Sequence, residues 1–195
     1  MEIKADYTEI HSAIRTIAEN GQIIELRALQ VPSADGFRRT VTGFFDDLEL
    51  FAQAAVKLSD AGAKGVYFTP NPVKSIPKTM PRNELRPATR GSATTDADIE
   101  RVNWLLVDID PCRPSGEAAS ASEKAAAERV CGHVAKYLQG LGWPNPLIGD
   151  SGNGYHLMYR VEGGTTETNR EILDTLAFLF NTNEAKVDQL VFNPS

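Results

Sequence analysis

Two aspartates near the middle of the chain are the residues whose types and spacing most suggest chemistry. Residues 104–107 form an apolar run rich in strand formers, and Asp108 and Asp110 follow it, ahead of Pro111. Residues two apart on a strand point to the same side, so the carboxylates are predicted to lie about 6.6 Å apart along the backbone. Burying either one unpaired costs several kcal/mol. A divalent cation such as Mg²⁺ removes this cost; the alternative is a solvated strand end.

A glycine-rich turn and a third aspartate lie further along the chain. Residues 151–156 read Ser-Gly-Asn-Gly-Tyr-His, and such glycines let backbone N–H groups approach an anion. Ser151 adds a hydroxyl donor, and His156 can donate to a triphosphate oxygen, although a lone histidine is more often a surface or core residue. Asp188 lies between Val187 and Gln189. A third carboxylate is what a two-metal site needs to hold both ions.

Length and composition are those of an ordinary globular protein. The chain has 195 residues, 42% of them hydrophobic and 24% charged, enough for one sizeable domain or two small lobes. No apolar run approaches the roughly 20 residues that span a bilayer, and the first residues lack signal-peptide order. Cys112 and Cys131 form no Cys-x-x-Cys and are predicted to be free thiols. We therefore expect a cytoplasmic protein with no membrane partner.

Charge is unevenly distributed along the chain. The net charge is −6, which argues against a protein that coats nucleic acid. Residues 74–90 nevertheless carry five basic residues against the single acid Glu84. This segment is predicted to be either a solvated loop or a loop that faces phosphates. Its basic residues are Lys74, Lys78, Arg82, Arg86 and Arg90.

The hydrophobic pattern of the first half predicts a helix, a hairpin, a second helix and a strand. Five prolines between residues 70 and 87 forbid a long helix there, so the chain from residue 70 to about residue 97 is predicted to be irregular. The predicted elements are helices over 7–20 and 46–61, hairpin strands over 22–29 and 40–45, and a strand over 66–69.

The second half predicts strand, helix, hairpin, helix and strand, which is the order of a split-βαβ, RRM-like sheet with helices on one face. The fold class is therefore α+β, with an N-terminal αβ lobe over about 1–97 and an RRM-like lobe over about 98–195. The Asn153-Gly154 pair predicts a tight turn. After the strand that starts near Trp104, the predicted elements are a helix over 120–139, strands over 146–148 and 155–161, a helix over 166–181 and a last strand over 186–192.

The three acidic and glycine-rich motifs resemble those of the archaeo-eukaryotic primase superfamily. Asp108-Ile-Asp110, the turn 151–156 and Val187-Asp188 stand in the order and spacing of its three motifs. The likeness runs nearly end to end and favours the prim-pol domains of phage, plasmid and CRISPR-associated replication proteins. Relatives continue into a basic segment, so the resemblance also predicts truncation at the C-terminus. The supporting flanks are Gly65–Val73, Thr94–Ile99, Trp104–Pro111 and Val191–Pro194.

The resemblance implies a template-directed nucleotidyltransferase, that is, a DNA primase, a DNA polymerase or both. Asp108, Asp110 and Asp188 would hold two Mg²⁺ or Mn²⁺ ions, with His156 also catalytic. The basic residues of 74–90 would contact the template or the triphosphate. Implied partners are NTP or dNTP, single-stranded DNA template and primer, and a helicase or other replication or CRISPR module. The residues implied at the nucleotide are Ser151, Gly152, Asn153, Gly154, His156, Asn71 and Thr95, the last two with loop capping as the alternative.

Three other functions fit part of this pattern. A primase remnant would bind nucleotide or single-stranded DNA without transferring a nucleotide, and the predicted truncation keeps it open. A glycosyltransferase with a metal-binding Asp-x-Asp leaves Asp188 and the serine-to-histidine turn unexplained. A nicking nuclease on a similar sheet needs a His-x-His metal pair, which the sequence lacks.

Overall fold

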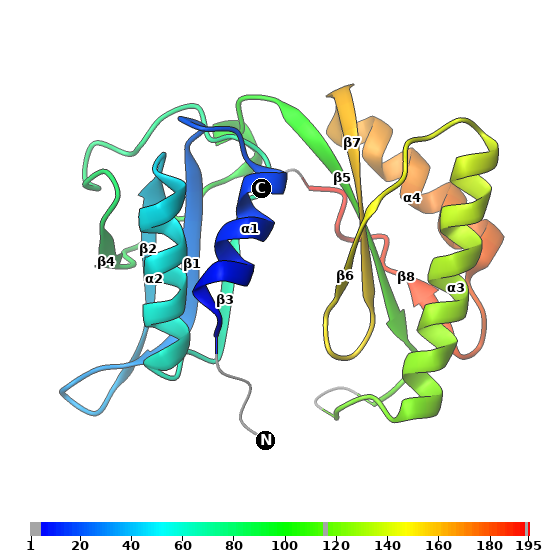
Figure 1. The fold of residues 1–195 in the computed structure, drawn as a ribbon, viewed down its shortest axis with the longest axis horizontal. Coiled ribbons are helices and arrows are strands. Elements are labelled where there is room, and N and C mark those ends of the chain that lie inside the picture. Colours follow the sequence, from blue (N-terminus) through cyan, green and yellow to red (C-terminus); the bar gives the residue numbers. More distant parts are fainter. Residues whose placement is uncertain (1–4, 115–116, 194) are drawn as a thin grey trace. The chain divides into compact units, whose positions relative to one another are not determined.

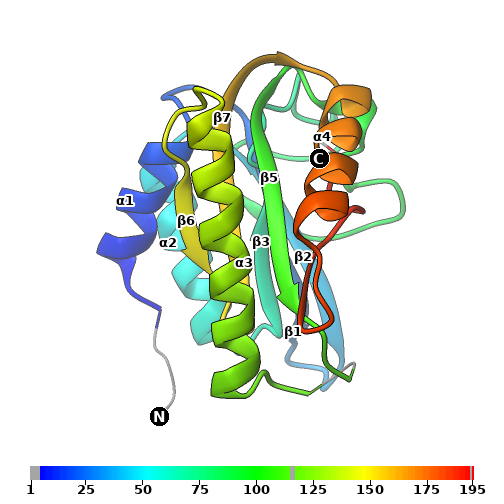
Figure 2. The ribbon, with the colours of Figure 1, turned by 90° about the vertical axis from the view of Figure 1, so that its right-hand side faces the viewer.

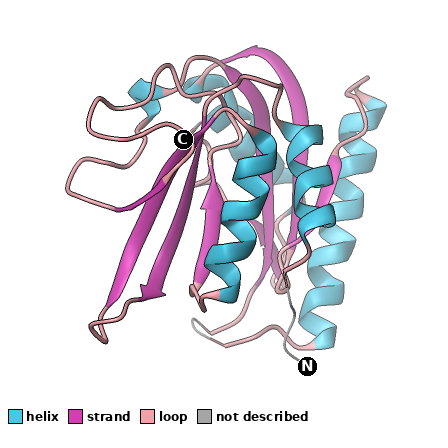
Figure 3. Cartoon of the chain, turned by 60° about the vertical axis from the view of Figure 1, so that its left-hand side comes forward, coloured by secondary structure: helices cyan, strands magenta, loops and turns pink. Residues whose placement is uncertain are grey.

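The chain divides into two compact units, and each contains its own four-stranded antiparallel sheet (Figure 1). The computed structural model describes residues 5–114, 117–193 and 195. The first unit ends at Arg101 and includes Ser195, and the second begins at Val102. Two antiparallel sheets and four α-helices in the described residues confirm the predicted mixed α+β class; Figure 3 distinguishes helices, strands and loops.

The first unit is a sheet of strand order β3-β1-β2-β4 that packs against two helices. Residues Ile24, Leu26 and Ala28 alternate along one strand and are buried in a core shared with Phe51 and Leu58 of a helix. The elements are α1 (Tyr7–Ile17), β1 (Ile24–Pro32), β2 (Arg38–Phe45), α2 (Leu48–Asp60), β3 (Gly65–Phe68), β4 (Leu85–Pro87) and the 3₁₀ helix η1 (Asp96–Asp98).

The proline-rich segment contains a strand that the hydrophobic pattern did not reveal. Residues 85–87 of β4 pair with residues 41–43 of β2. Three residues are too few to show a period, and Pro87 signals a break because proline cannot donate to a ladder. β1 also runs past its predicted end at Leu29, because a bulge between Ala28 and Val31 lets the pairing resume. Gln30 sits in that bulge with a φ of 52°.

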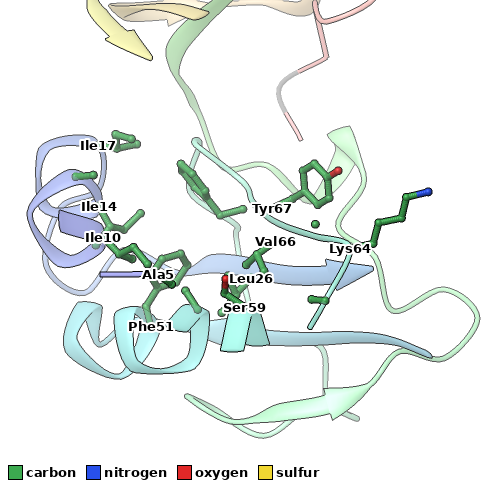
Figure 4. A pocket seen from close by; sticks show the side chains of 15 residues that line it. Ala5, Ile10, Ile14, Ile17, Leu26, Phe51, Ser59, Lys64, Val66 and Tyr67 are labelled. Atoms are coloured by element: carbon green, nitrogen blue, oxygen red, sulfur yellow. The ribbon is translucent and has the colours of Figure 1, made fainter. Parts of the chain in front are cut away.

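An apolar cavity of about 400 Å³ lies between α1, α2 and β3 of the first unit (Figure 4). Ile10, Ile14 and Ile17 line it from α1, Phe51 lines it from α2, and Val66 lines it from β3. Side chains that face such a space lose dispersion contacts on one side. We therefore expect α1 to gain less packing energy than a helix in a filled core.

The second unit is a sheet of strand order β6-β7-β5-β8, with both its helices on one face (Figures 1 and 2). Leu105, Val107 and Ile109 are fully buried in the core formed with these helices. Because strand side chains alternate, Asp108 and Asp110 point to the opposite, helix-free face. The elements are β5 (Val102–Pro111), α3 (Ala121–Gly140), β6 (Leu147–Asp150), β7 (Tyr155–Gly164), α4 (Thr166–Phe180) and β8 (Ala185–Val187).

The last strand is shorter than the one predicted over 186–192. β8 ends at Val187, and the carboxylate of Asp188 accepts a hydrogen bond of 2.8 Å from the N–H of Leu190. This Asx turn redirects the backbone, so pairing with β5 stops. Asp188 therefore follows the strand, whereas the sequence pattern put it at the opening.

Local sequence signals explain the start of α3. The Ser120 hydroxyl accepts from the N–H of Glu123, and the Glu123 carboxylate accepts from the N–H of Ser120 at 2.8 Å. This reciprocal capping box satisfies two N–H groups at the helix start. Cys131 on this helix and Cys112 are both free, as predicted. Across the described ranges, no helix combines the length and the apolar character that crossing a membrane requires.

Replacing Gly132 should stabilise the protein. Gly132 lies exposed inside α3, and a Cβ added there would meet no atom within 4 Å. Glycine in a helix interior costs about 0.8–1.0 kcal/mol relative to alanine. We expect Gly132→Ala to raise the free energy of unfolding by about 0.8 kcal/mol in chemical denaturation. Gly142→Ala is the contrasting control, because its φ of +87° strains any L side chain. A fall in stability of Gly132→Ala would contradict this account.

Candidate metal and nucleotide site

Asp108, Asp110 and His156 lie together on the helix-free face of the second unit. Asp108 is directly opposite His156 in the pairing of β5 with β7, and Nε2 of His156 lies 3.3 Å from Oδ1 of Asp108. Asp110 follows two residues later on the same face of β5. Both strands are central in the sheet, so hydrogen bonds to neighbours on each side fix their backbones.

β8 brings Asp188 next to Asp108 from the other side. The N–H of Asp188 donates to the carbonyl oxygen of Asp108 at 2.8 Å, one residue beyond the pairing of Ile109 with Val187. Val187 is buried on the helix face, so the next side chain points toward the face that carries Asp108. The Asp108–Asp110 pair and Asp188, which is distant from it in sequence, therefore lie on one face together with the imidazole of His156.

Burial and neighbouring charges shift the pKa values of two side chains in this group. Burial raises the pKa of Asp110, and Asp108 and Asp188 raise it further, while Arg113 and His156 lower it. The side-chain interaction with Asp108 raises the pKa of His156, burial lowers it, and the charges of Asp108 and Asp110 raise it. Two ionised carboxylates this close repel each other, so ionising both of them is costly.

The donor set fits a divalent cation that prefers oxygen. Oδ1 of Asp108 is buried and accepts no hydrogen bond of good geometry from the described residues, and Nε2 of His156 lies 3.3 Å from it. Mg²⁺ and Mn²⁺ bind carboxylate oxygens of this kind. Within residues 5–114, 117–193 and 195, no three acidic, histidine or cysteine side chains are already spaced as ligands of one ion. The carboxylates would therefore need to rotate to bind one.

The glycine-rich turn closes the hairpin of β6 and β7 next to Asp110. The N–H of Ser151 donates to the carbonyl oxygen of Gly154 at 3.1 Å. Gly152 has a φ of +88°, and a positive φ at the first central position is the mark of a type II′ hairpin turn. The centre of the turn is therefore Gly152-Asn153, and not the Asn153-Gly154 pair that the sequence pattern singled out.

Side-chain contacts tie this turn to the segment before α3. The N–H of Gly152 donates to the Asp150 carboxylate at 2.8 Å, and Lys124 of α3 pairs with the same carboxylate at 2.8 Å. Oδ1 of Asn153 accepts from the N–H of Ala119 at 3.0 Å. Asn153 thus has a structural contact here, and the turn is held in one position relative to α3.

Ser151 and His156 are better placed to donate to a phosphate than the amides of the turn. The N–H of Gly154 is already donated to Oγ of Ser151 at 2.9 Å, and those of Ser151 and Gly152 are also used within the hairpin. A serine hydroxyl that accepts one bond still keeps its own proton for another acceptor. The glycines of the turn predicted that its amides bind an anion, but the hydroxyl and the imidazole fit that role better.

Gly154 is required by its close approach to β5. A Cβ at this position would lie 2.2 Å from the carbonyl oxygen of Ile109 and 2.9 Å from Oδ1 of Asp110. Real Cβ contacts are essentially never this short, and the first atom belongs to rigid sheet backbone. Glycine therefore lets the turn pack directly against the acidic pair.

Asn71 and Thr95 both lie in the first unit. Asn71 is 1% exposed. The N–H and the hydroxyl of Thr95 both donate to the Asp98 carboxylate, at 2.9 and 2.6 Å, and open η1. Thr95 therefore makes the capping contacts that were the alternative to nucleotide binding, and the burial of Asn71 fits a structural side chain.

The basic residues of 74–90 also belong to the first unit, and all five are exposed. Three of them contact neighbouring oxygens. Exposed pairs of this kind are worth little and exchange readily, so they leave the side chains able to contact phosphate. The contacts are Lys74 with the carbonyl oxygen of Ala97 (2.6 Å), Arg82 with Asp46 (2.7 Å) and Arg86 with Glu84 (2.9 Å).

Comparisons of the chain with models of known families, with curated proteins and with solved structures found no match. The interpretation of the site therefore rests on its own side chains and on the resemblance of its motifs. The geometry adds two cations that sequence reasoning did not single out, Arg113 and Lys186, which line a pocket with Asp110 and Asp188. Lys186 lies two residues before Asp188, and residues two apart on a strand share a face, so this spacing could have predicted that Lys186 lies near the site.

The raised pKa of His156 should make the stability of the metal-free protein depend on pH. A histidine whose pKa is higher in the folded state stabilises the fold fully below its unfolded pKa of about 6.5. That contribution is lost as the pH rises through the raised value. We expect wild type to lose stability relative to His156→Asn over this range, by less than about 1 kcal/mol because the ring is partly exposed.

Thermal unfolding in chelator at several pH values measures this effect. His133→Asn, which removes an imidazole from the exposed surface of α3, is the matched control. A constant difference between wild type and His156→Asn across the range would show that His156 gains nothing from the acidic group.

Proposed function

We propose that this chain is a metal-dependent nucleotidyltransferase that extends a strand on a single-stranded template, as a primase or a DNA polymerase of the prim-pol type. The observation that carries the proposal is the gathering of three carboxylates and His156 on the helix-free face of one sheet. The antiparallel order β6-β7-β5-β8 supports an RRM-like, split-βαβ sheet for this unit. The acidic pair would then occupy a central strand of that sheet.

The carboxylates of Asp108, Asp110 and Asp188 would hold two Mg²⁺ or Mn²⁺ ions. Bound metal ions supply charge neutralisation at the attacking and the leaving oxygens. In the proposed reaction a 3′-hydroxyl gives up its proton to water, its oxygen attacks the α-phosphorus of an NTP or dNTP, and the bond from that phosphorus to the bridging oxygen breaks. Pyrophosphate leaves with the electron pair of that bond.

Two side chains would hold the incoming nucleotide for this attack. His156, whose pKa is raised by its contact with Asp108, would donate from a protonated ring to a phosphate oxygen. The hydroxyl of Ser151 would donate to a second oxygen. Fixing the triphosphate in line with the attacking oxygen lowers the entropic part of the barrier. The exposed basic residues of 74–90 are the proposed contacts to template phosphates.

Primer extension by the purified chain tests this proposal. A primed single-stranded template, nucleotides and Mn²⁺ should yield longer products, and chelator should abolish them. Calorimetry with nucleotide and Mn²⁺ separates the alternatives, because binding without product would identify a nucleotide-binding remnant. Neither binding nor product under these conditions would reject both functions.

A further inference from the structure

A pocket of about 520 Å³ opens at the end of β5 in the second unit, beside the acidic group. Two of its lining residues are the candidate metal ligands Asp110 and Asp188, and two are the cations Lys186 and Arg113. Pockets that mix carboxylates with Lys and Arg suit ligands that carry both anionic oxygens and a bound cation.

The short strand β8 holds Lys186 next to Asp110. The two residues pair directly across β5 and β8. Ala185 and Val187 on either side are buried toward the helices, so the side chain of Lys186 projects on the face that carries the carboxylates. Lys186 is exposed, which leaves its ammonium group accessible to a ligand.

Arg113 reaches the same pocket from the chain that follows β5. Its Nη1 donates to the carbonyl oxygen of Glu117. Its Nε, in contrast, is buried and has no hydrogen-bond partner among the described residues. A buried guanidinium donor without an acceptor is costly, and an anionic ligand in the pocket would supply one.

The other wall of the acidic group is the turn that carries Ser151. Gly154 of that turn approaches Asp110 so closely that an added Cβ would lie 2.9 Å from Oδ1 of Asp110. Asp110 therefore stands between the serine turn on β7's side and Lys186 on β8's side. A chain of phosphates lying across Asp110 can reach donors on both sides.

We propose that this pocket binds the β- and γ-phosphates of the incoming nucleotide, and then the metal–pyrophosphate product, through Lys186 and Arg113. The inference rests on the proposed function. Lysine supplies a point charge and arginine a planar fork, and both match closely spaced phosphate oxygens. Asp110 and Asp188 repel a bare anion, so the pocket takes pyrophosphate together with a divalent cation and not without it.

Calorimetric titration with inorganic pyrophosphate tests the pocket without requiring turnover. In the presence of Mn²⁺, Lys186→Gln should weaken pyrophosphate binding by about 10- to 100-fold, the usual loss for a hydrogen bond to a charged group. Lys136→Gln, an exposed lysine on α3, should bind as wild type does. Arg113→Lys, which keeps the charge but loses the fork, should show an intermediate loss.

The outcomes separate this inference from the proposed function. Equal pyrophosphate affinity in wild type and Lys186→Gln, with primer extension intact in both, would overturn the pocket and leave the function standing. Loss of pyrophosphate affinity in Lys186→Gln, with no extension by wild type, would support the pocket while rejecting nucleotidyl transfer. Circular dichroism checks that each variant is folded. Lys186 is exposed, so its substitution should leave the fold intact, and the Lys186 variant still tests the pocket if the Arg113 variant unfolds.

Discussion

Asp108→Asn should reduce primer extension by at least about a thousand-fold while leaving the fold intact. Asparagine keeps the shape of the side chain but removes the charge that would hold a metal ion. A catalytic metal contributes several kcal/mol to transition-state stabilisation, and each 1.4 kcal/mol or so is a factor of ten in rate. Gel-based extension with saturating nucleotide and Mn²⁺ measures the loss.

The unfolding temperature shows whether the loss is chemical or structural. Asp108 repels Asp110 but attracts His156. These interactions act in opposite directions between partly exposed groups, so the change in stability should stay within about 1 kcal/mol. Glu171→Gln, an exposed acid on α4, removes the same charge elsewhere and should extend primers at the parental rate. Parental extension by Asp108→Asn would mean that the acidic group is not the catalytic site.

Gly154→Ala should destabilise the protein by about 3 kcal/mol, the upper end of the usual cost of overpacking. The new methyl would overlap the carbonyl oxygen of Ile109 on a central strand, and neither backbone can move without breaking the pairing of β5 with β7. A fall of roughly 10 °C in the unfolding temperature is expected for a chain of this size. Nucleotide binding should fall with it, because the turn carries Ser151.

Gly149→Ala is the matched control in the same hairpin. Its added Cβ would lie 3.6 Å from Cβ of His156, an ordinary contact, so its stability should stay within about 0.5 kcal/mol of wild type. The comparison isolates the close approach of the turn to β5 from any general effect of alanine in the hairpin. Equal unfolding temperatures for the two variants would show that the turn can move away from Asp110 freely.

Local sequence signals predicted much of this fold. The apolar run 104–107 predicted strand β5, and period-two alternation predicted that both carboxylates lie on one side of it, opposite the buried Ile109. The helices predicted from residues 46 and 120 begin within two residues of the starts of α2 and α3, because the caps Asp47 and Ser120 act only within one turn. The hairpin of β6 and β7 was visible from its glycine-rich connection.

Features that depend on contacts between residues far apart in the sequence could not be predicted from local patterns. The run Leu190-Val-Phe192 resembles a strand, but the Asx turn of Asp188 ends the pairing before it begins. β4 exists only because β2 offers it a partner. The role of Asn153 depends on the N–H of Ala119, 34 residues away.

Asp188, the third carboxylate, is positioned by β8, a strand of only three residues at the edge of its sheet. Beyond its pairing with β5, this strand is fastened by the bonds from Val187 N–H to Oδ1 of Asn181 at 2.7 Å and from Cys112 N–H to the carbonyl oxygen of Glu184 at 2.7 Å. Short edge strands open locally at far lower cost than the whole domain unfolds. The position of Asp188 beside Asp108 and Asp110 therefore depends on a local equilibrium between paired and unpaired β8. Amide hydrogen exchange in β8 would report how often this strand separates from β5.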